Sequence, residues 1–86
     1  MAIRSTIQKI SIRQIKAARA LLDWSQDELA RRSGVSIPTI RRLEAKDGLL
    51  GGRGETRGKI VAALEDAGIR FLGGNSIGVR LKKRGS

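Results

Sequence analysis

The 86-residue sequence contains no cysteine and no histidine. Without cysteine the chain has no disulfide framework and no nucleophilic thiol, and without either residue it lacks the usual ligands of a zinc site. Imidazole, the most common general acid and base, is also missing. The remaining acidic residues form no catalytic constellation, so we expect a protein that is not an enzyme.

The glycine-rich stretch GGRGETRGK does not have the pattern of a nucleotide phosphate-binding loop. Five residues separate Gly52 from Gly58, one more than that loop has. Lys59 is followed by Ile60, where a serine or threonine would hold magnesium. We therefore expect no cofactor and no metal ion.

Aromatic side chains and long apolar runs are also scarce. One tryptophan, one phenylalanine and no tyrosine argue against a surface that stacks the bases of single-stranded nucleic acid. The apolar runs are far shorter than the ~20 residues of a membrane helix. The start, MAIRSTIQKISIRQ, has no apolar stretch of a signal peptide. We expect a soluble, cytoplasmic protein with no membrane partner.

Positive charge is what the sequence has in excess. Eighteen lysines and arginines against eight acidic residues give a net charge of +10 and a sequence pI near 11.6. A small domain with a pI above about 9 has the electrostatic character of a nucleic-acid binder. Charge alone leaves open a basic solvated surface, a ribosome-associated protein or binding to an anionic membrane. The helical segments lack the broad aromatic-rich face that the membrane alternative requires.

Three serines predict the starts of three helices. Ser11, Ser25 and Ser36 are placed as N-caps before segments with apolar residues at helical spacing. Gln14 and Glu28 lie three residues after the first two serines and predict capping boxes. Each serine also lies inside a pair of apolar residues with the spacing of a hydrophobic staple, namely Ile10 with Ile15, Trp24 with Leu29, and Val35 with Ile40.

The sequence leaves one helix start open and predicts one exposed helix face. Pro38 disfavours helical dihedral angles at Ile37, which leaves open a start of the third helix one residue later. Arg13, Lys16 and Arg19 recur on one face of the first helix, and we expect that face to be exposed to solvent.

A glycine-rich loop follows the third helix, and we expect Leu49 and Leu50 within it to fold inward. A fourth helix is predicted from about Thr56 to Gly68. Apolar and polar residues alternate over 69–82, which predicts a β-hairpin with about five residues per arm and GGNS as its turn. The predicted organisation is an N-terminal arm (1–10), a helical domain (11–68), this hairpin (69–82) and a basic tail (83–86).

Residues 25–44, SQDELARRSGVSIPTIRRLE, combine two short helices with a turn at Gly34, which is the pattern of a helix-turn-helix. Gly34 permits the left-handed conformation of a tight turn, and Ala30 is small enough for a close helix crossing. The outward face of the second helix carries Arg41 and Arg42, and an arginine can donate two hydrogen bonds to a guanine in the major groove.

This stretch resembles the DNA-binding domain of the Cro and lambda-repressor type, the xenobiotic-response-element-like family of bacterial and phage regulators. The resemblance implies a mainly α, compact four-helix domain with a short C-terminal β-hairpin or strand extension, and a recognition helix at about 37–45 in the major groove. The glycine-rich loop replaces the fourth helix of the five-helix members. The residues that carry the resemblance are Trp24-Ser25-Gln26, Leu29-Ala30, Gly34-Val35-Ser36, Thr39-Ile40 and Leu43-Glu44.

The resemblance also implies roles for individual residues. Gln26 matches a glutamine that bonds a phosphate and braces the recognition helix. Ile37 and Pro38 match base-contacting positions, where they offer only apolar contact to a thymine methyl. Thr39 matches a phosphate-contacting hydroxyl residue, and Arg42 matches a base-contacting position. The complete set of predicted DNA-contacting residues is Gln26, Ser36, Ile37, Pro38, Thr39, Arg41, Arg42, Lys46 and Arg53.

Several of these residues also have an alternative role that involves no contact with DNA. Arg41 and Arg42 could be a solvated helix face tied to Glu44 or Asp47, and Lys46 and Arg53 could clamp phosphates or only keep the loop soluble. Our main hypothesis is a sequence-specific regulator of transcription that binds double-stranded DNA as a homodimer on a palindromic operator. The hairpin is the candidate dimerisation element, because a strand edge needs a cover. The alternatives are an antitoxin that holds a toxin partner and autoregulates, and a basic adaptor that binds protein or RNA.

Overall fold

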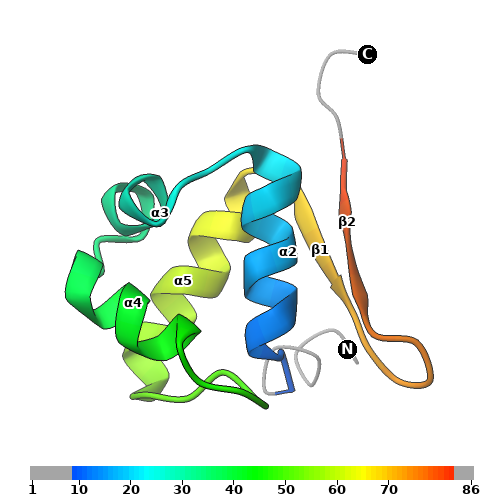
Figure 1. Cartoon of the computed structure of the whole chain (residues 1–86). Coiled ribbons are helices and arrows are strands. Elements are labelled where there is room, and N and C mark those ends of the chain that lie inside the picture. The colour runs from blue at the N-terminus through cyan, green and yellow to red at the C-terminus, as the bar shows by residue number, and fades with distance from the viewer. Residues whose placement is uncertain (1–8, 83–86) are drawn as a thin grey trace.

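The computed structural model describes residues 9–82. Within that range four helices are followed by a two-stranded antiparallel sheet (Figure 1). This confirms the mainly α fold with a C-terminal hairpin. Predictions for the N-terminal arm before residue 9 and for the tail from residue 83 lie outside the described residues. The elements are α2 (Ile12–Leu22), α3 (Gln26–Ser33), α4 (Ile37–Glu44), α5 (Gly54–Asp66), β1 (Ile69–Leu72) and β2 (Gly78–Leu81).

The N-cap of α2 is the predicted capping box. The Gln14 N–H donates to Ser11 Oγ at 3.1 Å, and the Ser11 N–H donates to Gln14 Oε1 at 2.9 Å. The second predicted box is wrong. Ser25 does accept from the Glu28 N–H at 3.0 Å, but the Glu28 carboxylate does not reach back to the cap, because it pairs with arginines of the next turn of α3.

The N-cap of α4 is Ser36, whose side chain accepts a hydrogen bond from the Thr39 N–H at 3.3 Å. The helix begins at Ile37, so the later start that Pro38 left open does not occur. Pro38 lies in the first turn, where a missing N–H removes no intrahelical hydrogen bond.

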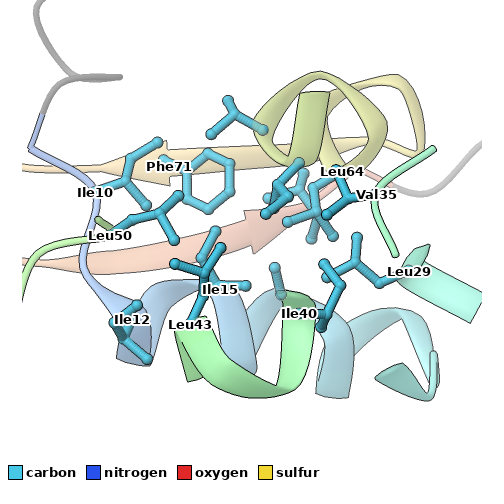
Figure 2. Close-up of a cluster of buried hydrophobic side chains, with 14 of the residues drawn as sticks. Ile10, Ile12, Ile15, Leu29, Val35, Ile40, Leu43, Leu50, Leu64 and Phe71 are labelled. Carbon is cyan, nitrogen blue, oxygen red and sulfur yellow. The ribbon is translucent and has the colours of Figure 1, made fainter. Parts of the chain in front are cut away.

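One hydrophobic core is enclosed by the four helices and the inner face of the hairpin (Figure 2). Leu50 is buried in it, as predicted, but the inward orientation predicted for Leu49 is wrong, because Leu49 is 60% exposed. The segment is extended and bonds to the start of α2, with the Leu50 N–H donating to Ile10 O at 2.8 Å. Adjacent side chains of an extended segment point in opposite directions. The core comprises Ile10, Ile12, Ile15, Ala18, Leu29, Ala30, Val35, Ile40, Leu43, Leu50, Ile60, Val61, Leu64, Ile69 and Phe71.

The fourth helix and the hairpin differ in length from the prediction. α5 begins two residues before Thr56 and ends at Asp66, and each arm of the hairpin has four residues rather than five. Gly68 joins helix to strand with a φ of 108°. A Cβ at this position would lie 2.8 Å from Lys82 O, so glycine is required both by the backbone angle and by the close approach of the second strand.

Gln14 also fastens the hairpin to α2. Its side chain is buried, and its Nε2 donates to Leu72 O and to Gly78 O, each at 2.8 Å. An isolated two-stranded hairpin is only marginally stable in water. The amide of Gln14 therefore holds the far end of the hairpin, while Ile69 and Phe71 bury the inner face of β1 in the core.

Candidate nucleic-acid interface

The turn between α3 and α4 is built as a helix-turn-helix requires. Gly34 has a φ of 76°, and its N–H donates to Ala30 O at 2.9 Å, which ends α3. Ala30 is buried beneath the turn, and Val35 enters the core directly after it. The chain thus passes from α3 to α4 within three residues, 34–36.

The two sides of α4 have different surroundings. Ile40 and Leu43 are buried in the core, so the helix has one fixed face toward the domain. On its other side Pro38, Arg41 and Arg42 are exposed to solvent. Ile37 and Thr39 are half-buried and Ser36 is exposed, so of the predicted contacts on α4 the proline and the two arginines project furthest from the domain.

A buried carboxylate fixes the end of α4. Glu44 is 4% exposed, and its two oxygens accept from Arg19 Nε at 2.8 Å and Arg19 Nη2 at 2.7 Å. Gln26 Nε2 donates to the same carboxylate at 2.9 Å, and Arg19 Nη1 donates to Trp24 O at 3.0 Å. The network joins α2, α3 and α4, so it sets the orientation of α4 relative to the rest of the domain.

This network corrects the sequence interpretation of Arg19. Arg13 and Lys16 are exposed, as predicted, but Arg19 turns inward to the carboxylate and its side chain is 18% exposed. The helical periodicity of α2 gave no sign of this, because the partner lies 25 residues away in the sequence. Gln26 braces Glu44 in the manner that the resemblance implies, and its contact with a DNA phosphate remains a prediction.

The Glu44 network makes stability depend on pH. Burial raises the pKa of Glu44, but the hydrogen bonds from Arg19 and Gln26 and the charge of Arg19 outweigh it, so the pKa lies below its ordinary value of 4.5. A carboxyl whose pKa is lower in the folded than in the unfolded state stabilises the fold above the unfolded pKa. That stabilisation is lost as the pH falls below about 4.5.

We therefore expect the melting temperatures of the wild type and of Glu44→Gln to converge in acid. At neutral pH the variant should melt lower, since glutamine cannot supply the buried charge that Arg19 faces. As the pH falls below about 4.5, Glu44 takes up a proton and the difference should shrink. Thermal unfolding from pH 7 to pH 3 measures it, and a difference that stays constant across this range would contradict the assignment.

The two basic residues at the end of α3 share one carboxylate partner in the same helix. Glu28 pairs with Arg31 at 2.6 Å and with Arg32 at 2.7 Å, and hydrogen bonds from these arginines lower the pKa of Glu28 to about 2. The Arg32 guanidinium also lies over the Trp24 ring, 4.8 Å from its centroid. Trp24 itself packs against the core, which agrees with a staple residue rather than a base-stacking platform.

The cations on and after α4 have no such carboxylate partner in the described residues. No ion pair among residues 9–82 involves Arg41, Arg42, Lys46 or Arg53, and all four side chains are exposed. In the described part of the chain, therefore, neither arginine of α4 forms an ion pair with Glu44 or Asp47, which was the alternative to DNA contact. Four cations without an ion pair in the described residues thus lie on α4 and in the loop that follows it, while others, such as Arg13, Lys16 and Arg80, lie elsewhere on the surface.

A shallow groove separates α4 from the start of α5 and brings two of the predicted residues together. Its volume is about 390 Å³. Arg42 lies on one wall, and Arg53, the residue before α5, lies on the other. Gln26 and Lys46 do not line it. Thr56, which the sequence did not single out, contributes a hydroxyl. The full lining is Thr39, Arg42, Leu43, Gly52, Arg53 and Thr56.

None of the helices within residues 9–82 has the length and apolar character needed to cross a membrane. Residues 9–82 also contain no group of three or more acidic side chains placed to hold a metal ion.

Residues 15–50 match the family model described as helix-turn-helix. The match runs from within α2, through α3 and α4, to the buried Leu50, so it includes the bracing network at Arg19 and Glu44 as well as the recognition helix. This segment belongs to the Cro/lambda-repressor-type helix-turn-helix family. It is the domain of a DNA-binding regulator, a class whose members are typically not enzymes. A comparison with curated proteins gives no match.

Proposed function

We propose that this protein is a sequence-specific regulator of transcription that binds double-stranded DNA as a homodimer on a palindromic operator. The observation that carries the proposal is the basic face of α4, whose arginines form no ion pair within residues 9–82 and which a buried carboxylate network holds on the domain. A rigid helix with free arginines on its outer side fits the major groove, and arginine is the side chain best suited to read guanine there. Such a regulator acts on the DNA of the cytoplasm, where we place it.

The side chains divide naturally between base and phosphate contacts. Arg41 and Arg42 project from the exposed side of α4 and are our candidates for hydrogen bonds to bases. Ile37 and Pro38 at the start of the helix offer apolar contact to thymine methyl groups. Contacts to phosphate supply most of the affinity and little of the specificity. We assign those contacts to Gln26, Ser36, Thr39, Lys46 and Arg53.

Dimerisation explains how so small an interface reaches useful specificity. A single recognition helix reads few base pairs, and two copies related by a two-fold axis read a near-palindromic site with half-sites about 34 Å apart. The domain is also small, and association buries surface that one copy leaves exposed.

Selection of bound duplexes from a random library tests the proposal. We expect an enriched, near-palindromic sequence, and an affinity for it that exceeds the affinity for random duplex by about 10³-fold or more. Affinity for either duplex should fall steeply with salt, because bound phosphates release counterions. Equal affinity for all DNA duplexes, together with an equal affinity for RNA, would contradict the operator hypothesis and favour the basic adaptor.

A further inference from the structure

The second strand of the hairpin has an open edge. Within residues 9–82 the sheet contains only β1 and β2, and β2 pairs with β1 alone (Figure 1). β2 lies on the side of the domain away from α4, so a partner at this edge leaves the recognition helix free (Figure 1). An uncovered edge is a template for pairing with another strand, and native proteins cover or block such edges.

The hydrogen-bond pattern shows which residues face that edge. The Lys82 N–H donates to Gly68 O at 2.9 Å, so this pair is hydrogen-bonded across the hairpin. Bonded and non-bonded pairs alternate along an antiparallel ladder, so Arg80 and Gly78 also direct their backbone groups toward β1. Val79 and Leu81 direct theirs outward. These two residues therefore carry the N–H and C=O groups available to a second strand.

Exposed apolar surface lies beside the same edge. Ile77 is 69% exposed, more than the other exposed large hydrophobic residues of the described range, Leu21, Leu49 and Leu72. It lines a groove of about 430 Å³ between the hairpin and α2, and most of the groove surface is apolar. The other lining residues are Ser11, Arg13, Gln14, Ala17 and Gly78.

We propose that the occupant of this edge is β2 of a second copy, paired antiparallel about a two-fold axis at Val79. The inference rests on the proposed function for the existence of a homodimer, and it adds which edge pairs and in which register. With the axis at Val79, Leu81 lies opposite Ile77 of the second copy, and the exposed isoleucine gains an apolar neighbour. Arg80 lies opposite Gly78 of the second copy.

Like-charge repulsion disfavours two other registers, and an axis at Gly78 would place Leu81 opposite Asn75 of the turn instead of opposite an apolar residue. Arg80 already has Arg70 opposite it on β1, and like charges directly opposite are destabilising. An axis at Arg80 would place the two Arg80 side chains opposite each other. An axis at Leu81 would place Arg80 opposite Lys82. Only the axis at Val79 places each Arg80 beside a residue without a side chain.

Nothing within one copy of the hairpin requires glycine at position 78. Gly78 has no positive φ. A Cβ there would meet only Leu72 Cδ1, at an ordinary contact distance of 4.0 Å. The proposed dimer supplies a reason for glycine. Because Gly78 has no side chain, it leaves room for the Arg80 side chain of the second copy.

Cysteine substitution maps the register directly, because the chain has no cysteine of its own. Val79→Cys places two thiols in a hydrogen-bonded pair with a Cα separation of ~5.5 Å, within the range that a disulfide spans. In Arg80→Cys the two Cα atoms are diagonal neighbours, ~7–8 Å apart, and in Leu81→Cys they are ~13 Å apart along the strand. We expect Val79→Cys to cross-link under mild oxidation at least tenfold faster than either of the others, free and on the selected duplex.

Cross-linking that is fastest at position 80 or 81, or absent at all three positions in variants that retain the wild-type circular dichroism spectrum, would overturn the register. Gly78→Arg gives a second test that needs no oxidation. It should weaken the dimer at least tenfold in sedimentation equilibrium, since it adds a cation opposite Arg80, and unchanged association would also overturn the proposal. A chain that selects an operator without the Val79 cross-link refutes only this inference, whereas a cross-linked dimer that binds all duplexes equally refutes only the proposed function.

Discussion

Replacing Glu44 with alanine is expected to lower the free energy of unfolding by about 3 kcal/mol. The substitution removes both acceptors of the Arg19 fork and the acceptor of the Gln26 amide, and it leaves a largely buried guanidinium without its carboxylate. Removing one partner of a buried ion pair usually costs ~3–5 kcal/mol. We expect the lower end of that range because the Arg19 side chain is 18% exposed and water can solvate it in part.

Urea denaturation with an unchanged m-value measures this effect. Glu55→Ala is the matched control, since that carboxylate is exposed and only loosely paired with Lys59 at 3.8 Å, and it should change stability by no more than about 0.5 kcal/mol. A double variant of Arg19 and Glu44 should be less destabilised than the sum of the two single variants, because it leaves no charge unpaired. A loss below 1 kcal/mol for Glu44→Ala would show that the network does not hold α4 in place.

Replacing Arg42 with alanine is expected to weaken binding to the selected operator by ~1–3 kcal/mol and to relax the base preference at one position in each half-site. Arg42 is exposed on α4 and lacks an ion-pair partner in the described residues, so its donors are available to guanine. Arg42→Lys should restore part of the affinity and less of the preference, because lysine lacks the two-pronged geometry of the guanidinium.

Arg53→Ala separates base contact from phosphate contact. Arg53 lies across the same groove from Arg42, and we expect its loss to weaken all duplexes alike and to reduce the salt dependence by about one phosphate. The experiment is repetition of the library selection with each variant, together with salt titrations. If Arg42→Ala also weakens all duplexes equally, Arg42 is a phosphate ligand at the groove, and the base contacts pass to Arg41.

The sequence by itself determined the local architecture. The caps at Ser11, Ser25 and Ser36 and the left-handed turn at Gly34 are decided by groups within a few residues of one another, and the structure contains all four. Interactions at such short separation leave a fixed spacing in the chain, which is why the positions of α2, α3 and α4 were predictable. The exposed arginines of α4 followed from the same helical period.

The tertiary structure decided the contacts that hold these elements together. Gln14 bonds to carbonyl groups 58 and 64 residues away, and Arg19 reaches a carboxylate 25 residues away. The sequence pattern placed Arg19 on a solvated face, since a partner at such distance leaves no periodic trace. Only the fold shows that Arg42 and Arg53 share a groove, and that within residues 9–82 the outer edge of β2 has no pairing strand. Local hydrogen bonds and hydrophobic period specify each helix, whereas the packing of the chain specifies which distant side chains can meet.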